Sequence, residues 1–160
     1  MENPREAYKE ITLHILSYFQ LLEFGLKAYI GHAYSTIKKS VGTKVHFDYT
    51  AKDVEEFPLE RLLSIFSKLN ANKELIKRLN KLRAERNHLA HNSLIIVMGS
   101  KYDAGAIEDR LQEYYLLEGE LTDCLNLVIE ESQSLMLQSK IWHKLVGGNP
   151  TKPLTPTLSP

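Results

Sequence analysis

The feature that most constrains the fold is a long run of helical hydrophobic spacing at the start of the chain. Apolar side chains recur at steps of three and four residues over residues 3–39, which is the period of an amphipathic α-helix. Asn3 followed by Pro4 is a typical helix start, because asparagine caps the first turn and proline has no amide hydrogen to leave unbonded there. Any fold of this chain must therefore pack around one very long helix.

Three later segments show the same period: Leu59–Leu69, a segment capped by Asn72 that ends near Ser93, and residues 106–145. The connector at 40–58 lacks this period, apart from a candidate short helix at 51–56. The pattern predicts an all-α, up-and-down bundle of four to five helices in one domain, residues 1–146. Residues 147–160 are predicted to be a disordered Pro/Thr-rich tail, because prolines at 150, 153, 156 and 160 prevent a helix.

Composition excludes several classes of protein. A hydrophobic fraction of 43% and a charged fraction of 25% are typical of a globular domain rather than a disordered or fibrous chain. Cys124 is the only cysteine, so neither an intramolecular disulfide nor a cysteine-based zinc site can form. No apolar run is long enough to cross a membrane, and the N-terminus lacks the pattern of a secretory signal, so we expect no membrane partner and a cytoplasmic location.

Charge is distributed unevenly although the formal net charge is zero. Residues 73–86 are locally basic and residues 103–131 are strongly acidic. The two helices either attract one another within the fold or present two different surfaces. The basic segment supplies the candidate RNA-binding residues Lys77, Lys81 and Arg83, because phosphate contacts rest mainly on Lys and Arg.

One arginine interrupts an apolar stripe. Residues 75, 79, 82, 86 and 89 share one face of the predicted helix, and all are leucine except Arg86. Burying an unpaired guanidinium is prohibitive, so Arg86 must pair with an acid, reach into a cleft, or line a surface shared with a second subunit.

Two further polar residues follow Arg86 within one turn and a half. Asn87 and His91 share a face, whereas Arg86 and His91 are about 140° apart around an ideal helix. They can meet on one ligand if the arginine side chain curls round, if the helix ends there, or if a second chain completes the site. Asn92 and Ser93 are typical of helix ends, which favours the second option.

This set of residues suits chemistry on a phosphodiester. Arginine binds phosphate oxygens with a planar fork of donors and stabilises charge that develops in a transition state. Histidine titrates near neutral pH and can take a proton from a ribose 2′-hydroxyl or return one to a leaving oxygen. Asn87 can hold either the histidine or the phosphate in place.

The sequence R-N-H-L-A-H at residues 86–91 resembles the Arg-(four to six residues)-His motif of HEPN domains, which often have a polar residue directly after the arginine. L-L-E-F-G-L-K-A-Y-I at 21–30 is similar to the Glu-x-x-x-Lys helix of many HEPN domains, with Glu23 and Lys27 in the matching places. L-E-R-L-L-S-I-F-S-K-L at 59–69 resembles the following helix of that family. The resemblance covers roughly residues 5–140.

The resemblance implies an all-helical homodimer whose two motifs face each other across a cleft. It implies a metal-independent endoribonuclease, often part of a toxin–antitoxin or phage-defence system, with no cofactor. Arg86, His91 and Asn87 would be catalytic, with Glu23 and Ser93 in supporting roles. HEPN toxins silenced by a nucleotidyltransferase partner usually carry His-x-Tyr, whereas this chain has H-N-S at 91–93. This departure weakens the case for a nucleotidyltransferase or antitoxin partner.

Simpler interpretations stay open. Arg86 can form an ion pair with Glu23 or with an acid of the last helix, and Glu23 with Lys27 can be an exposed pair spaced by four. His88 is assigned to a flanking surface. Glu85-x-x-His88 has the spacing of half a di-iron site, but no second copy occurs, so no metal is assigned. The tyrosines are assigned to packing.

The rival functional hypothesis belongs to another class. It is a catalytically inactive HEPN-like helical module that binds nucleotide, RNA or protein. RNA cleavage that depends on Arg86 and His91 separates the two hypotheses.

Overall fold

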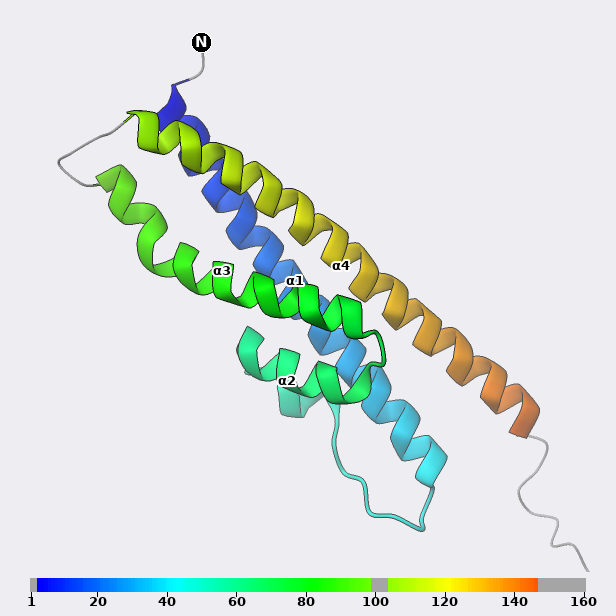
Figure 1. Ribbon diagram of the computed structural model, residues 1–160. Helices are drawn as coiled ribbons and strands as arrows, with labels where there is room; N and C mark the ends of the chain where they lie inside the picture. Colours follow the sequence, from blue (N-terminus) through cyan, green and yellow to red (C-terminus); the bar gives the residue numbers. More distant parts are fainter. Residues whose placement is uncertain (1–2, 99–103, 147–160) are drawn as a thin grey trace, which may run out of the picture.

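The computed structural model describes residues 3–98 and 104–146, with side chains for residues 3–90 and 105–145. Every regular element in these residues is helical, and no strand occurs among them, which confirms the predicted all-α class. The elements are α1 (Pro4–Val41), the short 3-10 helix η1 (Ala51–Val54), α2 (Leu59–Leu69), α3 (Lys73–Met98) and α4 (Ala104–Val146) (Figure 1).

Capping residues fix the starts of two helices, as the sequence predicts. The Asn3 side chain accepts a hydrogen bond from the Arg5 amide at 3.1 Å, and Asn72 accepts one from the Leu75 amide at 3.1 Å. Each bond satisfies one amide that has no partner within its helix. The local signals at these positions therefore set where α1 and α3 begin.

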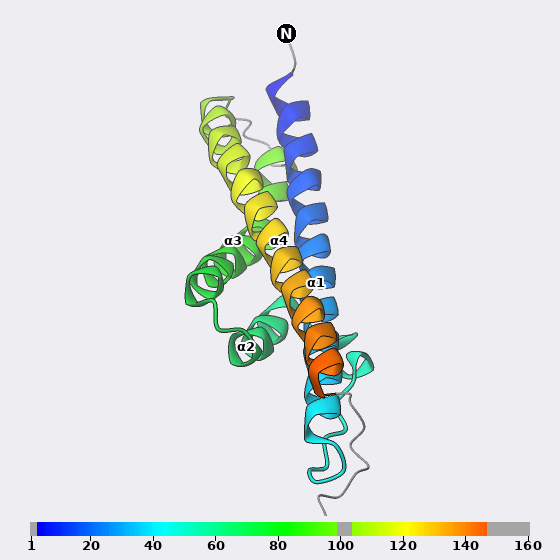
Figure 2. The same ribbon diagram turned by 90° about the vertical axis from the view of Figure 1, so that its right-hand side faces the viewer.

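Helices α1 and α4 form a long parallel pair, and α2 and α3 pack on one side of it (Figures 1 and 2). Near the start of the pair, the rings of Tyr8 and Tyr114 stack with centroids 5.3 Å apart. In the middle, a Cβ on Gly25 would stand 3.4 Å from Cγ1 of Val128, so glycine permits close packing of the two helices. The side chains that meet between the helices form one apolar core, which includes Ile15, Leu22, Leu26, Leu62, Phe66, Leu79, Leu121 and Val128.

The connection between α1 and α2 differs from the predicted up-and-down order. The connector turns back along α1: a Cβ on Gly31 would stand only 2.9 Å from Cβ of Ala51, and Lys27 Nζ donates to the Glu55 carbonyl at 2.7 Å. Helix α2 therefore starts beside the middle of α1 and runs in the same general direction, while α3 runs opposite to the other three (Figure 1). The up-and-down prediction is wrong for this first connection, because a long connector can return the chain before the next helix starts.

A polar network holds the turn between α2 and α3 against the long pair. Asn70 Nδ2 donates to the Tyr29 hydroxyl at 3.1 Å and to Glu131 Oε2 at 2.9 Å. Asn72 Nδ2 donates to the other carboxylate oxygen of Glu131, also at 2.9 Å. Because one carboxylate of α4 accepts from both asparagines, the start of α3 is fixed in place.

Helix α3 is longer than predicted. It continues to Met98 and so includes Asn92, Ser93 and the apolar run at 95–98. Residues 99–103 and the predicted tail at 147–160 lie outside the described residues. Among the described helices, none is both long enough and apolar enough to cross a membrane.

Candidate functional site

Arg86 lies on the side of α3 that faces α1. Its Nη2 is 3.8 Å from Oε1 of Glu23, which is within ion-pair range and beyond hydrogen-bond range. The Arg86 side chain is 42% exposed, whereas Glu23 is half-buried. The predicted alternative of an intramolecular ion pair is therefore present, but the pair is loose and leaves much of the guanidinium open.

The position of α2 explains why the leucine stripe of α3 can hold an arginine. Leu82 and Leu89, the stripe positions on either side of Arg86, are both buried. Arg83, one turn before Arg86, contacts Glu60 at the start of α2, with Nη1 3.5 Å from Oε1. Helix α3 extends well beyond this start (Figure 1). The turn that carries Arg86 is therefore not covered by α2, and a polar side chain can reach solvent there.

Glu23 and Lys27 do not pair with each other. Lys27 donates to the backbone carbonyl of Glu55, and Glu23 faces Arg86. The alternative of an exposed Glu-Lys pair on α1 is therefore wrong, and Glu23 stands where it can orient Arg86.

Of the other predicted catalytic and supporting residues on α3, only Asn87 has a described side chain. Asn87 is exposed on α3 one residue beyond Arg86. The side chains of His91 and Ser93 lie outside the described residues, although their backbone is helical. The prediction that the helix ends at 92–93 is wrong, because α3 continues to Met98. Along one continuous helix, Arg86 and His91 stay about 140° apart.

His88 points to a different part of the molecule. Together with Glu85 it lines a hollow of about 650 Å³ between α3 and α4, opposite Arg110 and Tyr114. The side chain is exposed, in keeping with its assignment to a flanking surface. Within the described ranges there is no group of three or more His, Cys, Asp or Glu side chains that could hold a metal ion.

The basic side chains of α3 have two kinds of surroundings: one pairs with acids of α4, and others are exposed. Arg78 donates two hydrogen bonds to Glu120 of α4, at 2.7 Å from Nε and 2.8 Å from Nη2, and its Nη2 lies 3.7 Å from Asp123. The hydrogen bonds from Arg78 hold the pKa of Glu120 below its usual value. The predicted attraction between the basic and acidic helices is confirmed at this pair. Lys77 and Lys81 lie at the surface.

Sequence reasoning missed a second hollow, between α1, the connector and α2. Tyr34, Tyr49, Phe57, Arg61 and Lys68 contribute to its lining. These residues come from three separate elements, so no local motif joins them. The signal that was available is the density of aromatic residues in the connector, where Phe47, Tyr49 and Phe57 fall within eleven positions.

Comparisons with models of known protein families, with curated proteins and with solved structures gave no match to this chain.

Proposed function

We propose that this protein is a homodimeric, metal-independent endoribonuclease of the HEPN type, which cleaves RNA by attack of a ribose 2′-hydroxyl on the adjacent phosphate. The observation that carries the proposal is Arg86: a guanidinium in a leucine stripe, held loosely by one carboxylate and 42% exposed. An arginine that served packing alone would be expected to make close hydrogen bonds like those of Arg78. The resemblance of residues 86–91 to the HEPN motif supplies the chemistry.

In this proposal Arg86 binds the scissile phosphate. Its contact with Glu23 at 3.8 Å is weak enough for a phosphate to take over the donors of the guanidinium, because partly exposed ion pairs contribute little free energy. Glu23 then keeps the guanidinium oriented from behind. His91 transfers the proton and Asn87 holds the phosphate or the imidazole, as the residue types suggest.

A second copy of the chain is part of the proposal. Because α3 does not end at 92–93, positions 86 and 91 of one chain are about 140° apart around the helix axis. A second chain removes this difficulty, since the arginine of one subunit can act together with the histidine of the other. A two-fold dimer would build two such pairs.

The outer face of the α1–α4 pair is suited to this second copy. We define it by the exposed apolar side chains Leu13, Leu21 and Phe24 of α1 and Ile129 of α4. Phe24 is 73% exposed and projects beside a hollow of about 260 Å³ that Gly25, Ala28 and Ile129 help to line. A projecting ring beside a hollow on the same surface is self-complementary, which a two-fold interface requires.

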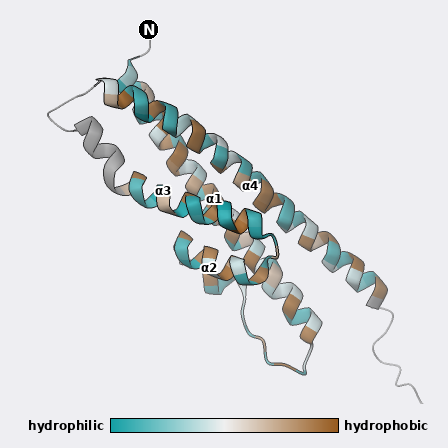
Figure 3. Cartoon of the chain, viewed as in Figure 1, coloured by the Kyte–Doolittle hydropathy of each residue, from teal (hydrophilic) through white to brown (hydrophobic). Residues whose placement is uncertain are grey.

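The area of the outer face is enough for an interface at the small end of the usual range. Residues 13–28 of α1 rise by about 23 Å and two adjacent helices are roughly 20 Å wide, so the face covers on the order of 500 Å² before side-chain relief is counted. A standard interface buries about 800 Å² of accessible surface per partner. The charged side chains Glu23 and Lys27 point away from this face, Glu23 toward Arg86 and Lys27 toward the Glu55 carbonyl. Figure 3 shows hydrophobic residues recurring along α4, whereas the coloured part of α3 is predominantly hydrophilic.

The experiment that tests the function is RNA cleavage by purified protein in EDTA. We expect products with 2′,3′-cyclic phosphate ends, and we expect cleavage to disappear in both Arg86→Ala and His91→Ala. Cleavage by the wild type that persists in both variants would contradict the assignment. If folded wild-type protein cleaves no RNA, the rival hypothesis of an inactive helical binding module replaces it. From the resemblance we further propose that the enzyme acts in a toxin–antitoxin or phage-defence system.

A further inference from the structure

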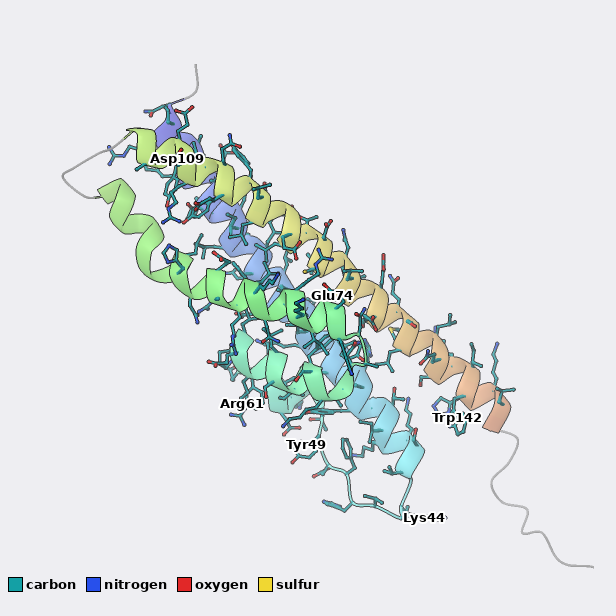
Figure 4. All side chains as sticks on the ribbon, in the orientation of Figure 1. Lys44, Tyr49, Arg61, Glu74, Asp109 and Trp142 are labelled. Carbon is teal, nitrogen blue, oxygen red and sulfur yellow. The ribbon has the colours of Figure 1, made fainter. Side chains whose placement is uncertain are left out.

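The hollow between α1, the connector and α2 has two chemically different walls. It encloses about 420 Å³, a volume within the usual range of ligand pockets. Its lining includes Tyr34 and Tyr49, which we call the aromatic wall, and Arg61 and Lys68 with Phe57, which we call the cationic wall. Figure 4 labels Arg61 at the start of α2 and Tyr49 on the connector below α2 in this view.

The aromatic wall is held rigidly and remains open to solvent. The rings of Tyr34 and Tyr49 are 5.5 Å apart between centroids, and Phe47 packs against both, at 5.8 Å and 5.5 Å. Tyr49 is nevertheless 58% exposed. A ring that is fixed by its neighbours and still exposed can stack on a planar ligand at little cost in conformational entropy.

Among the described residues, the cationic side chains of the hollow are not neutralised by a nearby acid. The Arg61 guanidinium lies over the Phe57 ring, with Cζ 3.7 Å from the ring centroid, and this cation–π contact favours one direction of the side chain. In the part of the chain that the structure describes, neither Arg61 nor Lys68 has an acid within ion-pair distance, whereas Arg78, Arg83, Arg86 and Arg110 each have one.

Asp53, the carboxylate in the lining of the hollow, is already engaged. Its Oδ2 accepts hydrogen bonds from the Thr50 amide at 2.6 Å and from the Thr50 hydroxyl at 2.9 Å. These bonds cap η1 and hold the pKa of Asp53 below its usual value. The charges of Arg61 and Lys68 are therefore available to an anionic ligand.

We propose that this hollow binds a nucleotide, with its base stacked on Tyr49 and Tyr34 and its phosphate bound by Arg61 and Lys68. Every base has a π face, so stacking on tyrosine is tolerant of sequence. Arginine and lysine are the usual phosphate ligands, and an arginine fixed by an aromatic ring loses little freedom on binding. The base of a nucleotide thus finds aromatic rings to stack on, and its phosphate finds cationic side chains.

The hollow continues toward Arg86. Arg61 and Ser64 also line a neighbouring hollow of about 560 Å³ between α2 and α3, which Asn80 and Arg83 complete. Arg83 lies one helical turn from Arg86. A nucleotide in the aromatic hollow can therefore belong to an RNA strand that passes Arg83 and reaches Arg86, and this extension rests on the proposed ribonuclease function.

Binding rather than cleavage tests the proposal. The probes are adenosine monophosphate, measured by calorimetry, and a short fluorescein-labelled 2′-O-methyl oligoadenylate, measured by anisotropy; the methyl group blocks cleavage by 2′-hydroxyl attack. We expect Tyr49→Leu and Arg61→Gln each to raise the Kd by roughly ten- to a hundredfold, the range typical of a lost stacking or phosphate contact. Tyr49→Phe retains the ring and should bind like wild type.

Two matched controls lie elsewhere on the surface. Tyr115→Leu removes an exposed tyrosine of α4, and Lys140→Gln removes an exposed cation of the same helix. Neither should change the Kd. Tyr49 and Arg61 are both exposed. We therefore expect the melting temperature of every variant to lie within about 2 °C of wild type, the range of ordinary surface substitutions.

Each outcome decides the proposal. Binding of both probes, or of the oligonucleotide alone, supports an RNA nucleotide as the ligand, and binding of adenosine monophosphate alone supports a free nucleotide. Failure of the wild type to bind either probe, or equal Kd values for Tyr49→Leu, Arg61→Gln and the controls, overturns it. The result is independent of catalysis: loss of binding in Tyr49→Leu supports the hollow even if no RNA is cleaved, and cleavage lost in Arg86→Ala supports the ribonuclease even if the hollow binds nothing.

Discussion

Helix α3 carries two arginines that face other helices, one near its start and one at its centre, and the two are held in opposite ways. Arg78, near the start of α3, donates two hydrogen bonds to Glu120 at 2.7 and 2.8 Å and is 26% exposed. Arg86, two turns later, reaches Glu23 only at 3.8 Å and is 42% exposed. The bidentate geometry at Arg78 joins two helices, whereas the open geometry at Arg86 leaves donors for a ligand. The same residue type on one helix is thus fully engaged in packing near the start of α3 and only loosely held at its centre.

The surroundings of each arginine explain this division. Arg78 lies just after the turn fixed by Asn70, Asn72 and Glu131, where α3 is clamped between its neighbours. Arg86 lies beyond the start of α2, where α3 is covered on fewer sides. A segment packed on several sides gives fixed distances for a bidentate pair, and a less covered segment leaves room for a substrate or a second chain.

The largest expected effect is on catalysis by Arg86→Ala. We expect cleavage to fall by at least about a hundredfold, the loss typical of one removed donor to developing charge, while the free energy of unfolding changes by about 0.5 kcal/mol or less, as at an exposed site. Initial rates on a fluorescent RNA and urea denaturation measure the two quantities. Arg78→Met is the matched control and should show the opposite pattern. A large loss of stability in Arg86→Ala, with cleavage retained, would remove the distinction between the two arginines.

Phe24→Asp should separate the subunits. It places a charge on the outer face, where burial against a second copy would strand it, so we expect the protein to elute as a monomer and to lose cleavage. Because Phe24 is exposed in the single chain, the fold should persist by circular dichroism. Leu116→Asp, at an equally exposed position on the other side of α4, should leave the dimer intact. A Phe24→Asp protein that is still a dimer would show that the outer face is not the interface between the two copies.

The Arg78–Glu120 pair should contribute modestly to stability. We expect Arg78→Met to lower the free energy of unfolding by about 1–2 kcal/mol, since the pair is bidentate but only partly buried. A double-mutant cycle with Glu120→Gln in urea isolates the interaction, and a coupling energy near zero would mean that the two hydrogen bonds do not hold α3 to α4. The equivalent cycle between Arg86→Met and Glu23→Gln should give a coupling close to zero, because that contact is loose.

Acid should weaken the stabilisation that the Arg78–Glu120 pair provides, and this effect should be smaller than those above. The pKa of Glu120 in the folded protein is below its usual value of about 4.5, mainly because Arg78 donates hydrogen bonds to its carboxylate. A lowered folded pKa stabilises the fold above the unfolded value, and this contribution is lost as the pH falls through the folded pKa. The difference in melting temperature between wild type and Arg78→Met should therefore be full at pH 6 and should narrow below pH 4.5. A difference that stays constant down to pH 3 would contradict this assignment.

Periodicity and capping predicted most of the helical content. The cap at Asn72 and the segment Leu59–Leu69 appear as expected, because both signals are local. The direction of α2 could not be predicted, since it depends on how the connector packs at Gly31 and Lys27. Asn92 and Ser93 have low helix propensity, but propensity is a weak signal and the helix continues through them.

The candidate site was predictable only in part. Arg86 was identified because it breaks a stripe of leucines, a pattern visible in the sequence alone. Its partner Glu23 was named as one of several acids, and only packing selects among them. The hollow around Tyr49 and Arg61 was missed because its residues belong to different elements and meet only after the connector folds back.

The central claim is that Arg86 supplies half of a site that a second chain completes. The most direct measurement mixes two inactive proteins, Arg86→Ala and His91→Ala, after their subunits have exchanged in mild denaturant. If each site takes its arginine from one subunit and its histidine from the other, half of the dimers are mixed and each holds one intact pair, so the mixture should recover about a quarter of the wild-type cleavage rate. A mixture that stays inactive while the wild type, treated in the same way, cleaves RNA would contradict the claim.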